Sequence, residues 1–162
     1  MVCTRPTFVY MPGLNVNIIV SNINNGYAGL AASMNPSSLS TLRKLHFDFF
    51  INDESEDPLW GIDAEITCFS KHNVIEEIDL TVNVQTDCQC TTDDQWGRLD
   101  AMFSTGFPRL SQVSLNINIC VFGSDGLVLQ EKLKKLPEEQ FPWLSKNSTV
   151  MFKFSTEVIS MV

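Results

Sequence analysis

Three side chains that could form an acyl-transfer site, His46, Asp79 and Ser114, lie at equivalent positions of three similar segments, "LHF", "IDL" and "VSL". Such a site needs the histidine between the carboxylate and the serine, within hydrogen-bond reach of the serine hydroxyl. If the three segments are neighbouring strands, Asp79 lies in the middle, and two strand steps, roughly 9.6 Å, separate His46 from Ser114. The chain also has no G-x-S-x-G nucleophile elbow. We therefore expect a protein that is not an enzyme.

Residue types that bind metals also occur, but their spacing does not fit a metal site. Cys88 and Cys90 are closer together than the cysteines of most zinc sites, and no second pair accompanies them. His72 is expected in a loop or at a helix end. The acidic segment 53–57 (DESED) lacks the glycine and the final glutamate of an EF-hand loop. We predict neither a metal nor a cofactor.

The elements that would position these residues follow a repeated pattern. Four segments show the alternation of apolar and polar residues that is typical of a half-buried strand. Their apolar positions are Leu45, Phe47 and Phe49; Ile78, Leu80 and Val82; Val113, Leu115 and Ile117; and Val150, Phe152 and Phe154. We take the strand anchors as positions 45, 78, 113 and 150. A weaker segment of the same kind is Val16, Ile18 and Val20.

Helical segments are predicted between the strands. "WGIDAEITCF" from Trp60 and "WGRLDAMFST" from Trp96 begin with the same dipeptide, and "LVLQEKLKKLPEEQ" predicts a third helix that ends at Pro137. The apolar faces of the first two are Ile62, Ile66 and Phe69, and Trp96, Leu99, Met102 and Phe103. A unit of strand and helix that recurs at least three times indicates a solenoid, because one unit cannot bury its apolar face alone. We predict one α/β repeat domain over residues 1–162, with four or five irregular repeats.

An ordinary doubly wound α/β domain would also alternate strands and helices. Its sheet is covered on both faces, so its strands tend to be apolar throughout, whereas the strands here carry polar residues at alternate positions. No strand is followed by a glycine-rich phosphate loop. The alternative function on such a sheet is that of a small hydrolase or transferase.

Several stretches of the chain carry a resemblance to a known family. "LSQVSLNINIC" resembles a leucine-rich-repeat strand with Asn118 at the asparagine position, and "IEEIDLTVN" places Asn83 likewise, while "LRKLHFDFF" has Phe50 there. "DQWGRLDAMFSTGFPRLSQVSL", followed by "LPEEQFPWL", resembles the C-terminal half of fungal F-box proteins with irregular leucine-rich repeats. The resemblance covers roughly residues 39–158.

The resemblance implies a fold and a role. The fold is a curved parallel sheet with short helices on its outer face, and the repeats would hold a substrate of a cullin-based ubiquitin ligase. No segment of the chain is interpreted as an F-box, which docks the ligase adaptor in that family. We therefore expect that this chain does not bind the adaptor directly.

The polar residues of the four strands are the candidate binding site. If the apolar positions point to the core, their alternates line the opposite, concave face, which is the usual binding surface of a solenoid. They are His46, Asp48 and Phe50; Asp79, Thr81 and Asn83; Ser114, Asn116 and Asn118; and Met151, Lys153 and Ser155. This mixture of amides, acids, one aromatic residue and one histidine suits contacts with a protein.

Charge and cysteine usage restrict the partners and the compartment. A formal net charge of −8 repels phosphate groups, so we expect neither nucleic acid nor an anionic membrane as partner. We find no signal peptide and no apolar stretch of spanning length. Five scattered cysteines are unlike a disulfide framework, so we expect free thiols, with Cys68 and Cys120 in the core, and a cytoplasmic or nuclear protein.

Both ends of the chain are apolar. The C-terminal "STEVISMV" and the N-terminal residues 8–14 carry little charge, although the ends of a solenoid need a polar cap. We expect that missing chain or a second copy covers at least one end, and a homodimer through an uncapped end is one such arrangement.

Overall fold

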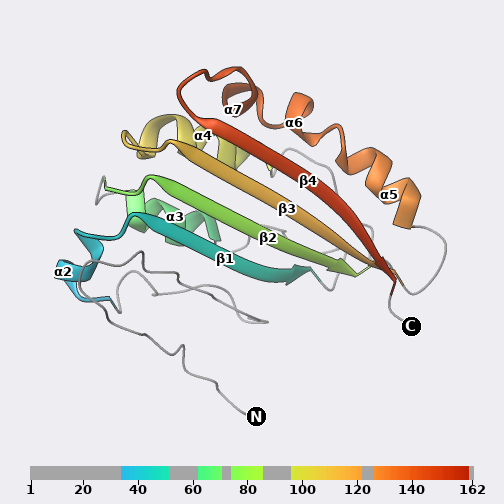
Figure 1. Cartoon of the computed structure of the whole chain (residues 1–162), viewed down its shortest axis with the longest axis horizontal. Coiled ribbons are helices and arrows are strands. Elements are labelled where there is room, and N and C mark those ends of the chain that lie inside the picture. Colours follow the sequence, from blue (N-terminus) through green and yellow to red (C-terminus); the bar gives the residue numbers. More distant parts are fainter. Residues whose placement is uncertain (1–33, 52–61, 71–73, 86–95, 122–125, 161–162) are drawn as a thin grey trace, which may run out of the picture.

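The structure is a computed structural model, and it describes residues 34–51, 62–70, 74–85, 96–121 and 126–160. Four parallel strands form one sheet in the order β1-β2-β3-β4 (Figure 1). The strands are β1 (Lys44–Ile51), β2 (Glu77–Gln85), β3 (Gln112–Val121) and β4 (Met151–Ser160). The helices are α2 (Pro36–Leu39), α3 (Ile62–Ser70), α4 (Gly97–Gly106), α5 (Gly126–Leu133), α6 (Leu136–Glu139) and α7 (Pro142–Lys146). The chain is therefore a mixed α/β protein with a four-stranded parallel sheet and short helices.

The register of the first three strands agrees with the sequence prediction. Leu45 lies opposite Ile78, and Ile78 lies opposite Val113. The fourth anchor was wrong by two residues, because Phe152, and not Val150, lies opposite Val113. The carboxamide oxygen of Asn147 accepts hydrogen bonds from the backbone N–H groups of Thr149 and Val150, which holds Val150 in a turn before the strand. Val150 is buried there without belonging to β4.

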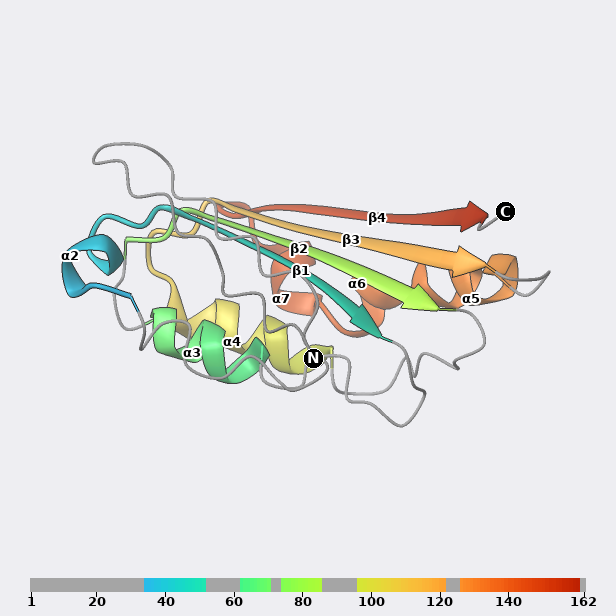
Figure 2. The same ribbon diagram turned by 90° about the horizontal axis from the view of Figure 1, so that it is seen from below.

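The helices α3 to α7 all lie on one side of the sheet (Figure 2). As predicted, Ile62, Ile66 and Phe69 of α3 and Leu99 and Phe103 of α4 are buried, and Trp96 is buried directly before α4. Met102, predicted on the same face of α4, is only partly buried. A Cβ added to Gly106 would come within 2.9 Å of the Ser70 Cβ, so glycine permits the close approach of α4 to α3. This layer seals the core against one face of the sheet.

The cysteine prediction was wrong for Cys68. Its side chain is exposed on α3, because Ile66 and Phe69 occupy the face that packs on the sheet. Cys120 is buried near the end of β3, and both are free thiols. The remaining cysteines, Cys3, Cys88 and Cys90, lie outside the described residues.

The connection between β3 and β4 holds three short helices where the sequence predicted one. The predicted helix ends at Leu133, and Pro137 lies in the first turn of α6 and does not end the first helix. Proline suits a first turn, because the N–H that it lacks has no intrahelical acceptor there. Leu133, Leu136 and Leu144 are buried, one from each helix. The chain therefore bends twice in order to keep one leucine of each short helix in the core.

A buried carboxylate on α4 joins this helix to α7. Asp100 on α4 is only 6% exposed, and its two carboxylate oxygens accept hydrogen bonds from the backbone N–H groups of Trp143 and Leu144, each at 2.9 Å. These N–H groups belong to the first turn of α7, where no intrahelical acceptor is available. The N-cap residue of α7 is Phe141, whose side chain cannot accept a hydrogen bond. Asp100 therefore caps α7 from a neighbouring helix.

The two edges of the sheet differ in how well they are covered. The helix-side residues of β1, including Leu45 and Phe47, are fully buried. Their counterparts Phe152, Phe154 and Val158 on β4 are only partly buried. The core is therefore complete at β1 and incomplete at β4. The N-terminal apolar segment, the weak strand pattern at 16–20, and Met161 and Val162 lie outside the described residues.

Candidate protein-interaction face

The predicted polar residues lie together on the face of the sheet that is opposite the helices, which we call the polar face (Figure 2). The strand register arranges them in rows, each with one residue per strand. The rows are His46, Asp79, Ser114 and Lys153; Asp48, Thr81, Asn116 and Ser155; and Phe50, Asn83, Asn118 and Glu157. Phe50 takes its place by backbone register alone, and its side chain is outside the described part of the structure.

A ladder of amides crosses three strands of the polar face. The Asn83 Nδ2 donates to the Asp48 Oδ1 at 2.7 Å, and the Asn118 Nδ2 donates to the Asn83 Oδ1 at 2.9 Å. Asn83 is only 9% exposed, so its amide would be costly to leave without partners. The ladder fixes the orientation of these side chains.

Lysine and acid side chains form a second cluster, at the beginning of β1 and β2. The Lys44 Nζ lies 2.8 Å from the Asp79 Oδ2 and 3.1 Å from the Glu77 Oε2. The hydrogen bond to Asp79, and then the one to Glu77, raises the pKa of Lys44 above its usual 10.5, while desolvation opposes this shift. The single positive charge of Lys44 therefore offsets one of the two carboxylate charges, and this corner of the polar face keeps an excess of negative charge.

The Lys44 cluster predicts a stability difference that disappears at high pH. A lysine whose pKa is raised by folding stabilises the protein at every pH below its unfolded pKa, and this contribution is lost as pH rises through the folded pKa. We expect the Lys44→Met variant to be less stable by up to about 1 kcal/mol at neutral pH, because the pair is partly exposed. Urea denaturation should show this difference shrinking above pH 10.5. Lys132→Met, an exposed lysine on α5, is the control, and a Lys44→Met effect that is constant with pH would contradict the assignment.

The β3–β4 half of the polar face is also hydrogen-bonded. The Lys153 Nζ donates to the Gln112 Oε1 at 2.9 Å, and the Ser155 hydroxyl donates to the Asn116 Oδ1 at 2.7 Å. Ser114 is buried, and its hydroxyl oxygen accepts a long hydrogen bond of 3.4 Å from the Gln112 Nε2. The face is therefore a network of oriented amides, hydroxyls and charges, and not a set of independent solvated side chains.

Five polar residues of this face were missed by the sequence prediction. They are Lys44, Glu77, Gln85, Gln112 and Glu157, and each extends the alternation of its strand by one further step. Continuing the period of two to the ends of the strands would have found them.

The arrangement does not match the catalytic geometries that the same residue types suggest. Asp79 lies between His46 and Ser114 in the register, as expected, so the histidine is not placed beside the serine. Among the described residues, no group of three His, Cys, Asp or Glu side chains could hold a metal ion. Cys88, Cys90, His72 and the acidic segment 53–57 lie outside those residues.

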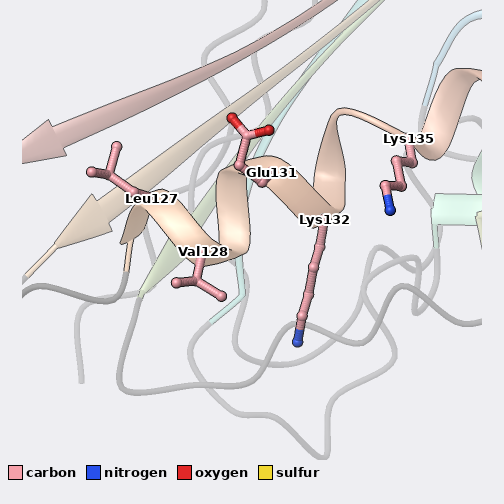
Figure 3. A pocket seen from close by; sticks show the side chains of 5 residues that line it. All are labelled: Leu127, Val128, Glu131, Lys132 and Lys135. Atoms are coloured by element: carbon pink, nitrogen blue, oxygen red, sulfur yellow. The ribbon is translucent and has the colours of Figure 1, made fainter.

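A hollow elsewhere on the surface is separate from the polar face. It is lined by Leu127, Val128, Glu131, Lys132 and Lys135, all on α5 or just after it (Figure 3). None of these residues belongs to the rows defined above. No helix of the described ranges has both the length and the apolar character needed to cross a bilayer.

No protein-family model matches this chain, and neither a curated protein nor a solved structure matches it.

Proposed function

We propose that this chain is a non-catalytic protein-interaction module, a leucine-rich-repeat-like solenoid that binds a protein partner on its polar face. The role is similar to that of the substrate-binding repeats of F-box ubiquitin-ligase proteins. Scattered cysteines, of which Cys68 and Cys120 are free thiols, favour a cytoplasmic or nuclear location.

The observation that carries the proposal is the oriented hydrogen-bond network on the side of the sheet opposite the described helices α3 to α7. Polar groups held in fixed positions lose little conformational entropy on binding, and this preorganisation favours affinity. Thr81 lies near the centre of this network, half-buried and flanked by Asp48 and Asn116 in its row. A face of amides, hydroxyls and charges fits the polar groups of a protein surface better than a small apolar ligand.

The solenoid part of the proposal is supported by the repetition of the unit. Each strand pairs in parallel with the next one along the chain, and each connection carries helices on the same side. The polar network recurs at equivalent positions of successive strands, as Asn83 and Asn118 show.

Affinity capture with a matched pair of variants tests the proposal. Thr81→Arg places a long charged side chain at the centre of the polar face, and Ala101→Arg places the same side chain at an exposed position of α4, on the opposite side of the sheet. We expect a protein that is captured by the wild type and by Ala101→Arg to be lost with Thr81→Arg. With that protein purified, the Kd of Thr81→Arg should rise about tenfold or more, the cost of displacing a well-packed contact at the centre of an interface.

Two outcomes would refute the binding face. One is that Thr81→Arg retains the partner with unchanged Kd, and the other is that both variants lose it equally. Circular dichroism and thermal denaturation of each variant establish that both remain folded.

A further inference from the structure

The exposed large hydrophobic residues of the described structure all lie on β4 and on α5, at one edge of the sheet. Among the described strands, β4 pairs with β3 alone. The exposed large hydrophobic residues are Met151 (58%) and Ile159 (38%) on β4, and Leu127 (65%) and Val128 (62%) on α5. Edge strands of soluble proteins are usually short, charged or covered, because an unprotected edge is a template for another strand.

The backbone of β4 is oriented for further pairing. The Met151 N–H donates to the Ser111 carbonyl, so Met151 faces β3, and alternate residues of a parallel strand share this orientation. The intervening residues, Phe152, Phe154, Thr156 and Val158, then direct their backbone groups away from the sheet. The Thr156 carbonyl accepts a hydrogen bond from the Gln130 Nε2 on α5, which is consistent with a carbonyl that points away from β3.

The sequence of β4 is self-complementary when two copies run antiparallel about Ser155. In this register Lys153 lies opposite Glu157 of the other copy, twice in the dimer, and Met151 lies opposite Ile159. On the helix side, Phe152 lies opposite Val158. Every residue that directs its backbone outward then meets another such residue, so the hydrogen-bond pattern is satisfied as well. The Thr156 carbonyl has two lone pairs and can accept from both Gln130 and the new strand.

We propose that two copies of this chain associate through β4, antiparallel and centred on Ser155, to form one continuous eight-stranded sheet. The charge complementarity of Lys153 and Glu157 selects this register over its neighbours. A shift by one residue of each strand (Thr156 opposite Thr156) would place Lys153 against Ile159. The interface includes Lys153, Ser155 and Glu157 of the polar face, but the proposal does not rest on the binding of a protein partner.

The position of α5 fits the same arrangement. Figure 1 shows α5 beyond β4 at the outer edge of the sheet, and Figure 2 shows it on the helix side. The two-fold axis stands perpendicular to the sheet, so both helix layers lie on one side, and α5 of each copy faces the helix layer of the other. Leu127 and Val128, two of the exposed large hydrophobic residues, project from the first turn of α5 at this edge (Figure 3).

Charge reversal and charge exchange test the register. Sedimentation velocity at physiological salt, which screens the repulsion between two chains of net charge −8, should show a wild-type dimer that dissociates across a hundredfold dilution. Lys153→Glu and Glu157→Lys should each raise the dimer Kd about tenfold, because two attractive cross-strand pairs become repulsive. The double variant exchanges the charges and should restore the wild-type Kd. A wild type that stays monomeric throughout, or a double variant no better than the single variants, overturns the proposal.

A cross-link tests the centre of the interface. Ser155 would face its own copy as a non-hydrogen-bonded pair, with Cα atoms roughly 4.5 Å apart, which is within the range that a disulfide spans. Mild oxidation of the Ser155→Cys variant should give a peptide joined to itself at position 155, detectable by mass spectrometry. Ser104→Cys on the exposed side of α4 is the control. A dimer without the position-155 cross-link would mean a different interface and would overturn the proposed one.

Discussion

Replacement of Asp100 by alanine is expected to lower the free energy of unfolding by about 3 kcal/mol. The substitution removes both acceptors of the Trp143 and Leu144 N–H groups in a region where Asp100 is buried. Bulk water cannot replace them without opening the contact between α4 and α7. Chemical denaturation followed by circular dichroism measures the change.

The Asp100→Asn variant separates the role of the charge from that of the acceptor. Its single carboxamide oxygen can still accept from one of the two N–H groups, so we expect a loss of about half that of alanine. Glu139→Ala, an exposed acid on α6, is the control and should change stability by less than about 0.5 kcal/mol. An Asp100→Ala variant as stable as this control would show that α7 does not depend on the carboxylate.

Replacement of Phe47 by alanine is expected to destabilise the protein by about 4 kcal/mol, the cost of removing a fully buried phenyl ring. Phe47 also makes an edge-on contact with Phe69, with ring centroids 6.4 Å apart. Phe154 occupies the same row at the opposite edge of the sheet, but it is only partly buried. Phe154→Ala should cost the monomer about 2 kcal/mol, because less apolar surface is withdrawn from water there.

This pair of variants measures how incomplete the core is at β4. Both are phenylalanine-to-alanine changes on edge strands of one sheet, so the difference between them reports burial and not side-chain chemistry. Urea denaturation at low protein concentration isolates the monomer. Equal losses for Phe47→Ala and Phe154→Ala would mean that the β4 edge is as well covered as the β1 edge.

The strands could be predicted from sequence because their signal is local. A period of two over Ile78, Leu80 and Val82 indicates which side chains face the core. The same pattern, beginning at Leu45 and at Val113, gave the correct alignment of the first three strands. The fourth strand departed from this pattern because the turn at Asn147 holds Val150 before β4, so the alternation of the strand is aligned from Phe152. A turn of this kind is a side-chain to backbone interaction that periodicity does not detect.

The remaining features depend on contacts between distant residues. The cap on α7 joins residues that are 43 and 44 positions apart, and the sequence around Phe141 does not indicate that α7 is capped by a residue of α4. The ladder of Asn83 with Asp48 and Asn118 likewise exists only once the strands are in register. Cys68 was misplaced because a cysteine beside Phe69 is apolar enough for the core, and only the packing of α3 decides which face it occupies.

The register of the sheet also determines how the polar face can be recognised. Neighbours within a row, such as Asp48, Thr81 and Asn116, come from positions 33 and 35 residues apart in the chain, and the step from β3 to β4 is 39. Along any one strand, the residues between two polar-face positions point to the opposite side of the sheet. No linear peptide cut from this sequence therefore reproduces the face. It is a wholly discontinuous epitope, so a ligand or antibody specific for it will distinguish folded from denatured protein.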